Sequence, residues 1–173
     1  KSGRRELAER FVASENPFTN RVIANRLWHH VFGRGLVATP DNFGRLGEPP
    51  THPELLDHLA SRLQHNGGSI KQLLRYVASS HAFQLTAQPN EGSAERDPEN
   101  KLLSHFPARR LEVEAIRDSM LALTGKMDIA EGAPADGASY RRSVYTRVIR
   151  NKLDPFLSAF DFPVPSATRG QRD

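Results

Sequence analysis

Polar side chains of unusual type share one face of a helix predicted between residues 17 and 32. The row consists of Arg21, Asn25, Arg26, His29 and His30. Residues three or four apart lie on the same side of an α-helix, so these groups are neighbours. Guanidinium and amide groups suit fixed, planar hydrogen bonds, whereas a fully solvated face more often carries Lys, Glu and Gln. Two roles fit this polar row: it holds the backbone of the Gly- and Pro-rich loop 36–50, or it lines a pocket for a polar ligand.

Histidine is frequent near this row, yet its spacing predicts no metal site. The adjacent rings of His29 and His30 point about 100° apart on a helix and cannot chelate one ion together. His52 is placed at a helix start, and no HExxH or carboxylate-flanked pattern joins His58 and His65. We expect the histidines to hydrogen-bond the backbone at helix ends or to face water. His52 stays with the polar row as a candidate ligand contact.

A single acid interrupts the apolar side of a second helix, predicted for residues 108–124. The apolar arc comprises Leu111, Val113, Ala115, Ile116, Met120, Ala122 and Leu123. Glu112 falls in the middle of this arc, where a carboxylate must be paired or protonated. A structural ion pair with Arg26 or Arg147 is one explanation. The alternative is a general acid or base with a raised pKa, which makes Glu112 the candidate catalytic residue.

Arginines are concentrated between residues 140 and 153. The stretch contains five basic residues and no acid, which is one signature of a polyanion-binding surface. Arginines that flank a strand more often pair with carboxylates of the same fold, and no aromatic RNA-binding motif accompanies these. We therefore predict no nucleic-acid binding. Arg142 and Tyr145 from this stretch, with Arg117 and Asp118 from the polar side of the preceding helix, complete the candidate site residues.

Helix start and stop signals organise the first half of the chain. A first helix ends near Ser14. Asn16-Pro17 predicts an N-cap and a first helical position, so the helix with the polar row runs from there to Phe32, and Gly33 ends it. The patterns Thr51-x-x-Glu54 and Ser69-x-x-Gln72 are capping boxes that open two more helices. The glycine pair between them predicts a tight turn and hence an αα-hairpin.

The second half of the chain contains fewer regular signals. Beyond the helix at 108–124, residues 142–149 alternate apolar and polar side chains and predict one strand. Residues 154–160 predict a short helix, and the tail 163–173 has no periodicity. The predicted fold is therefore mainly α, a single helical domain over residues 1–173 with an αα-hairpin and one short β element.

Composition excludes several classes of function. The chain has 173 residues with 38% hydrophobic and 25% charged side chains and a net charge of +4. No apolar run is long enough to span a membrane. The absence of cysteine excludes disulfides, thiolate metal sites and covalent haem attachment within these residues.

Long motifs carry a family resemblance over nearly the whole chain. They are NPFTNRVIANRLWHHVFGRGLVATPDNFGRLGEPPTHPELLD, DPENKLL, RRLEVEAIRDSMLALTG, RRSVYTRVIRN and DPFLSAFDFPVPSATRGQR. The chain resembles the planctomycete cytochrome-c-associated (PSD-type) domain of unknown function. Two family tryptophans are replaced here, by His58 and Gly68. The family domain continues further than this chain, so the resemblance implies a C-terminally truncated domain and leaves the predicted strand without a partner.

The resemblance implies a cellular setting that the residues themselves do not show. Family domains form the C-terminal part of large exported multidomain proteins, so a periplasmic or extracellular location is expected. A cytochrome c-like domain of the parent protein is the implied partner, with haem c on that separate domain and no cofactor in this chain. The implied function is an accessory or ligand-binding domain, with glycans of extracellular polysaccharide as possible ligands. The alternative is a catalytic domain, hydrolase-type or redox-coupled, with a polar Arg/Asn/His/Glu pocket.

Overall fold

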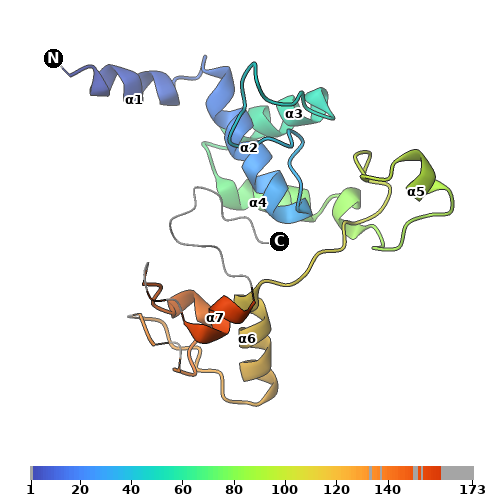
Figure 1. Ribbon diagram of the computed structural model, residues 1–173. Coiled ribbons are helices and arrows are strands. Elements are labelled where there is room, and N and C mark those ends of the chain that lie inside the picture. Colours follow the sequence, from blue (N-terminus) through green and yellow to red (C-terminus); the bar gives the residue numbers. More distant parts are fainter. Residues whose placement is uncertain (1, 133, 137, 150–151, 153, 161–173) are drawn as a thin grey trace. The chain divides into compact units, whose positions relative to one another are not determined.

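The computed structural model describes residues 2–132, 134–136, 138–149, 152 and 154–160, and its fold is mainly α (Figure 1). The predicted tail 163–173 lies outside the described residues. The α-helices are α1 (Arg4–Val12), α2 (Pro17–Phe32), α3 (Pro53–His65), α4 (Ile70–Ala78), α5 (Ser93–Arg96), α6 (Val113–Leu123) and α7 (Pro155–Ala159). Two 3-10 helices are η1 (His81–Gln84) and η2 (Ser143–Tyr145). Among the described residues, no helix is both long and apolar enough to cross a membrane.

Helix α2 begins and ends where its local signals predict. The Asn16 side chain accepts a hydrogen bond from the backbone N–H of Phe18, and Pro17 occupies the first helical position. Gly33 ends the helix in the left-handed conformation with φ of 81°, and its N–H donates to the carbonyl of His29. Only glycine adopts that conformation without steric cost, so the helix stops at this residue.

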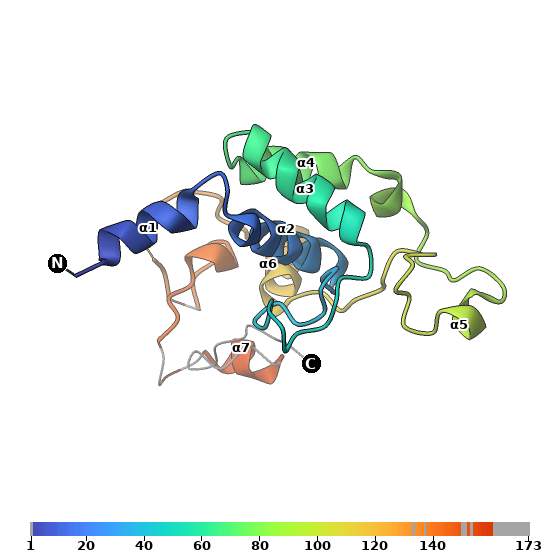
Figure 2. The ribbon, with the colours of Figure 1, turned by 90° about the horizontal axis from the view of Figure 1, so that it is seen from above.

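Helices α3 and α4 form the predicted αα-hairpin, α3 packs against α2, and α4 adds buried residues to the same core (Figure 2). Ser69 caps α4 by accepting a hydrogen bond from the N–H of Gln72. The buried core of this part consists of Ala24, Trp28, Phe32, Leu36, Val37, Leu56, Leu59, Leu63, Leu73 and Val77. Burying one Leu of such a stripe contributes about 1.5–3 kcal/mol. The core therefore fixes the orientation of α2 and of the polar row on it.

The capping box predicted at 51–54 is wrong. Helix α3 starts at Pro53, and its N-cap residue His52 makes no side-chain capping hydrogen bond. The Thr51 hydroxyl instead donates to the carbonyl of Leu36 at 3.3 Å, and the N–H of Thr51 donates to the same oxygen at 2.9 Å. Thr51 thus joins the helix start to the loop that follows α2.

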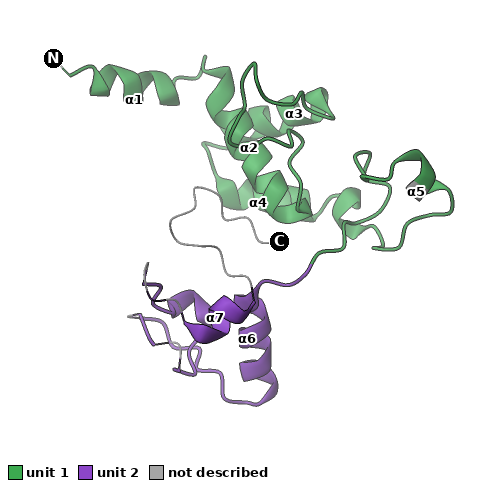
Figure 3. Cartoon of the chain, viewed as in Figure 1, with its two compact units in different colours: residues 1–109 green, residues 110–173 purple. Residues whose placement is uncertain are grey.

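The chain forms two compact units, residues 1–109 and residues 110–173 (Figure 3). The first contains the helical core around α2, α3 and α4. In the second, the buried hydrophobic residues among those described are Val113 and Leu157. The single-domain boundary at 1–173 stays a prediction.

Helix α6 is shorter than predicted, and this changes the position of Glu112. The helix starts at Val113 and not at residue 108, so Glu112 is its exposed N-cap residue with extended backbone. The predicted burial of Glu112 in an apolar arc is therefore wrong. Of that arc only Val113 is buried, and Leu111 and Leu123 are 65% and 88% exposed. Residues 107–112 are not helical, and Arg109 instead donates a hydrogen bond to the carbonyl of His30 at 2.7 Å.

The strand predicted at 142–149 is also wrong. Residues 143–145 form the 3-10 helix η2, and the described part of this stretch makes isolated bridges, Ala135 with Thr146 and Ile149 with Lys152. The reason is tertiary: Asp118 accepts a hydrogen bond from the N–H of Ser143 at 2.7 Å. That contact holds the chain in a turn although its side chains favour a strand.

Candidate functional site

Asn25 holds the loop after α2 through its side-chain amide. Its Nδ2 donates to the carbonyl of Val37 at 3.0 Å, and its Oδ1 accepts from the N–H of Val37 at 2.8 Å. Asn25 is 0% exposed, so both bonds are shielded from water. For this residue, the first predicted role of the polar row, holding the loop backbone, is confirmed.

Gly35 allows the loop to approach Asn25 closely. A Cβ at this position would lie 2.5 Å from the carbonyl oxygen of Val37 and 2.8 Å from Nδ2 of Asn25. Real Cβ contacts are longer than this, so a larger residue would force the loop away from α2. Gly35 is thus part of the same fixed arrangement.

The two arginines of the polar row bind different partners. Arg21 donates to Asp57 of α3 at 2.6 Å, which joins α2 to the hairpin. The hydrogen bond from Arg21 holds the pKa of the Asp57 carboxyl below its ordinary value. Arg26 pairs with Asp41 of the loop at 3.4 Å. The row therefore connects α2 to two neighbouring segments and does not converge on one point.

The histidines of the row do not form a chelating pair. The ring centroids of His29 and His30 are 5.7 Å apart, with the planes inclined by 76°. Burial lowers the pKa of His29, and the charges of His30 and Arg109 lower it further. His52 contacts the Thr51 hydroxyl at 3.0 Å beside the start of α3. In the described ranges, no three His, Asp or Glu side chains are grouped closely enough to hold a metal ion.

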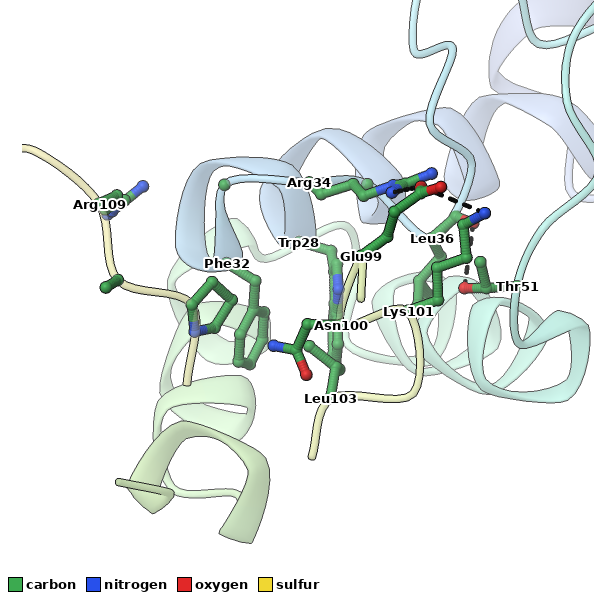
Figure 4. A pocket seen from close by; sticks show the side chains of 14 residues that line it. Trp28, Phe32, Arg34, Leu36, Thr51, Glu99, Asn100, Lys101, Leu103 and Arg109 are labelled. Carbon is green, nitrogen blue, oxygen red and sulfur yellow. Dashed lines mark hydrogen bonds and ion pairs between the residues drawn. The ribbon is translucent and has the colours of Figure 1, made fainter. Parts of the chain in front are cut away.

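A pocket of about 290 Å³ lies beside the C-terminal end of α2 (Figure 4). Its apolar floor is formed by Trp28, Phe32, Leu36 and Leu103. The rings of Trp28 and Phe32 lie 4.2 Å apart between centroids, and Phe106 packs 5.8 Å from Phe32. These aromatic contacts belong to the buried core, so the floor of the pocket is rigid.

A hydrogen-bonded turn at residues 97–102 forms one wall of the pocket. Asp97 accepts hydrogen bonds from the N–H groups of Lys101 and Leu102 at 2.9 and 2.6 Å. Asn100 has a positive φ of 49°, a conformation that asparagine tolerates, and its Nδ2 donates to the carbonyl of His105 at 2.8 Å. These bonds position the residues of the turn that line the pocket.

The rim of the pocket carries four charged side chains. Glu99 lies between Arg34 and Lys101 (Figure 4), and its Oε2 is 2.7 Å from Arg34 and 3.2 Å from Lys101. The hydrogen bond from Arg34, with a second from Lys101, lowers the pKa of Glu99. Arg109 lies at the other end of the pocket and donates to the carbonyl of His30. The formal charge of this rim is therefore positive.

Sequence reasoning missed this pocket. The signal was present in the DPENKLL motif, because Asp-Pro and Asn are turn residues at the positions that shape the wall. The motif alone does not indicate which distant segment of the chain the turn contacts. The contact between this turn and the end of α2 spans more than sixty positions, as the pairing of Arg34 with Glu99 shows.

A second polar cluster lies in the unit 110–173, around Arg117. Its guanidinium donates to the carbonyl of Arg141 at 2.9 Å, to the Ser143 hydroxyl at 3.2 Å and to the carbonyl of Ser139. Asp118 accepts from the N–H of Ser143 and pairs with Arg142 at 3.5 Å. Three predicted site residues, Arg117, Asp118 and Arg142, thus come together to hold the backbone of residues 139–143.

Tyr145 lies beside this cluster. The guanidinium of Arg141 stacks on its ring, 4.5 Å from the centroid. A shallow pocket of about 430 Å³ adjoins the cluster and is lined by Arg117, Met120, Leu121, Ala138, Asp154, Pro155 and Phe156. Its two charged residues already form hydrogen bonds with the backbone: Asp154 caps α7, and Arg117 donates to the carbonyl of Arg141. The pocket at α2 is the better candidate because charged side chains surround its apolar floor.

Comparison with known sequences identifies a family. The model of PSD1, described as a protein of unknown function (DUF1553), matches residues 3–173. The chain belongs to this family. The match confirms the resemblance to the PSD-type domain, and the matched residues include α2, the loop that follows it and the pocket wall. No curated protein matches the chain, and no solved structure matches it.

Proposed function

We propose that this domain is an accessory module that binds a small ligand in the pocket at the C-terminal end of α2. The supporting observation is the combination of a rigid aromatic floor, Trp28 and Phe32, with a charged rim. Ligand sites typically pair an apolar cavity with a few polar groups that fix orientation. The volume of about 290 Å³ suits a single ring or one sugar unit.

Binding fits the site better than catalysis. Glu99 is the carboxylate of the pocket, and its lowered pKa keeps it ionised near neutral pH. A general acid at that pH needs a raised pKa. Asn25 is occupied by the backbone of Val37, to which its amide both donates and accepts. Neither Glu99 nor Asn25 therefore suits the role of a general acid in the pocket.

We further propose a cellular setting for the domain. It would form part of an exported multidomain protein, beside a cytochrome c-like domain that carries haem c. A glycan ligand would place one sugar unit over the aromatic floor of the pocket.

Trp28 makes the proposal directly testable. It is the chain's only tryptophan, so its indole N–H gives one resonance that reports on the pocket floor. Monosaccharides, uronic acids and single-ring organic compounds would be screened by NMR. We expect at least one class to shift the Trp28 resonance in a saturable way.

A blocking variant separates pocket binding from surface binding. Ala108→Phe narrows the pocket that Ala108 lines, whereas Ala78→Phe adds the same ring at an exposed position of α4. The first substitution should abolish the shift and the second should leave it. A screen in which nothing shifts Trp28, or in which Ala108→Phe has no effect, contradicts the proposed function.

The partner is tested separately with the cytochrome c-like domain of the same parent protein. Titrating that domain into this one should give saturable binding by calorimetry. Heat equal to that of dilution would contradict the partnership and leave the pocket assignment unaffected.

A further inference from the structure

We propose that the pocket takes an organic anion, an apolar ring-sized body with one carboxylate or sulfate, whose acidic group replaces Glu99 between Arg34 and Lys101. This inference rests on the proposed ligand-binding function and specifies its ligand class. In the structure, one oxygen of Glu99 receives both cations, at 2.7 Å from Arg34 and 3.2 Å from Lys101. The site of an anionic group is therefore already formed, with a side chain of the protein in it.

Glu99 can be displaced because its ion pairs face water. The side chains of Arg34, Lys101 and Glu99 are 37%, 44% and 57% exposed. Ion pairs at this exposure are weak, since water and salt screen them. Glu99 can turn to solvent while its backbone stays fixed by the Asp97 turn, and a ligand that also fills the apolar floor gains contacts that Glu99 does not make.

The charge balance of the pocket favours an anion. Arg34, Lys101 and Arg109 carry three positive charges against one negative charge on Glu99. The C-terminal end of α2 opposes this with a partial charge of about −0.5. However, the carbonyls of His29 and His30 already accept hydrogen bonds from Gly33 and Arg109, which compensates this end of the helix.

Glu99 also determines which ligands are accepted. A neutral ligand offers Arg34 and Lys101 no replacement charge, so Glu99 stays in place and narrows the pocket mouth. An anion supplies that charge and opens the site. The inference therefore predicts selection between ligands of the same shape and different charge.

The experiment uses three small probes of the same ring: benzoate, phenyl sulfate and benzamide. Benzoate and benzamide have nearly the same shape, but only benzoate is charged at neutral pH. The Trp28 indole resonance is followed by NMR in the wild type and in Glu99→Gln, Lys101→Gln and Arg34→Gln. Glu91→Gln and Arg75→Gln are matched controls, because they make the same charge changes at exposed positions outside the pocket.

We expect benzoate or phenyl sulfate to shift Trp28 and benzamide to bind at least about fivefold more weakly. Glu99→Gln should tighten anion binding roughly two- to fivefold by removing the internal competitor. Lys101→Gln and Arg34→Gln should each weaken it about fivefold, with both controls unchanged. The preference between benzoate and phenyl sulfate identifies the acidic group.

Two outcomes overturn the inference and remain distinct from failure of the proposed function. If benzamide binds as well as benzoate and Glu99→Gln changes nothing, the pocket binds ligands but does not select anions. If no anion shifts Trp28 even in Glu99→Gln, the ligand class is wrong, while the wider screen with Ala108→Phe still decides whether the pocket is a binding site.

Discussion

Asn25 and Val37 are joined by two hydrogen bonds, one in each direction, between a side-chain amide and a peptide backbone. The amide of Asn25 presents a donor and an acceptor side by side, which matches the C=O and N–H of a single residue. Aspartate lacks the donor and leucine lacks both. Asparagine at this buried position thus fixes the loop that starts at the pocket and returns to α3.

Replacing Asn25 with alanine should destabilise the domain strongly. Both backbone groups of Val37 would lose their partner in a buried place, at about 1–3 kcal/mol for each. We expect a loss of about 2–4 kcal/mol in the free energy of unfolding, measured with urea. Asn20→Ala on the same helix is the control, and its effect should stay within about 0.5 kcal/mol. Equal effects of the two substitutions would contradict the role of Asn25.

Gly35→Ala should destabilise the same region for a steric reason. The added Cβ would meet the Val37 carbonyl and the Asn25 amide at less than a normal contact distance. Such overpacking costs about 1–3 kcal/mol. At Gly44, where nothing lies within 4 Å, the same change should be neutral or slightly stabilising in thermal unfolding. A Gly35→Ala protein that melts at the wild-type temperature would exclude this close approach.

Arg117 should be irreplaceable by lysine. Its planar guanidinium reaches three acceptors in residues 139–143, and an ammonium group cannot contact them with the same geometry. Arg117→Lys should therefore increase amide hydrogen exchange in residues 139–146, and Arg142→Lys, at an exposed position, should change it much less. Unaltered protection of these amides from exchange in Arg117→Lys would show that the segment keeps its structure without the Arg117 guanidinium.

Asp118 should make the stability of its unit depend on pH. Burial opposes ionisation of Asp118, but hydrogen bonds from Ser143 and Arg142 outweigh it, so its pKa lies below the ordinary 3.8. A lowered folded-state pKa gives stability that is complete above that ordinary value and is lost as the pH falls through the folded value. The difference in unfolding free energy between wild type and Asp118→Asn should therefore shrink below pH 3.8. A difference that stays constant down to about pH 3 would contradict the lowered pKa.

Glu112 should tolerate substitution. Glu112 is exposed and makes no side-chain capping bond, and its charge near the helix start contributes about 0.3–1 kcal/mol. Interactions of an exposed carboxylate are screened by water, so Glu112→Ala should cost less than about 2 kcal/mol in urea unfolding, and Glu112→Asp should stabilise α6 slightly because aspartate caps well. A loss of about 3–5 kcal/mol in the free energy of unfolding would instead support the buried ion pair that the sequence pattern suggested.

The predictions that were confirmed depend on neighbouring residues. Asn16-Pro17 and Gly33 define α2 because capping involves groups only a few positions apart. A role of Asn25 in holding the loop was one of the two roles predicted, because the residue and the loop lie on one short stretch of chain. By contrast, Glu112 was placed in an apolar arc because a helical wheel assumes the helix boundary, and α6 begins one residue after it.

The predictions that failed depend on contacts distant in sequence. Val144, Thr146 and Val148 alternate as in a strand, but Asp118 and Arg117 fix Ser143 from 25 and 26 positions away. Thr51 matches a capping box, but its hydroxyl donates a hydrogen bond to the carbonyl of Leu36 instead of capping α3. The pocket rim joins Arg34 to Glu99, and no periodicity in the sequence indicates that pairing. Such competition between partners is decided by packing and is not visible in the local pattern.

Helix α1 is attached to the rest of its unit mainly through its last turn. Asn16 donates to the carbonyl of Arg10 at 3.1 Å, Thr19 donates to the carbonyl of Phe11 at 2.7 Å, and none of the α1 residues is buried. Cleavage of the connection at residues 13–15 by a protease would therefore release a peptide without opening the core around Trp28. Limited digestion should yield a long-lived fragment that starts near Asn16 and melts cooperatively. The beginning of α2 is thus the N-terminal boundary of the rigid part of this unit.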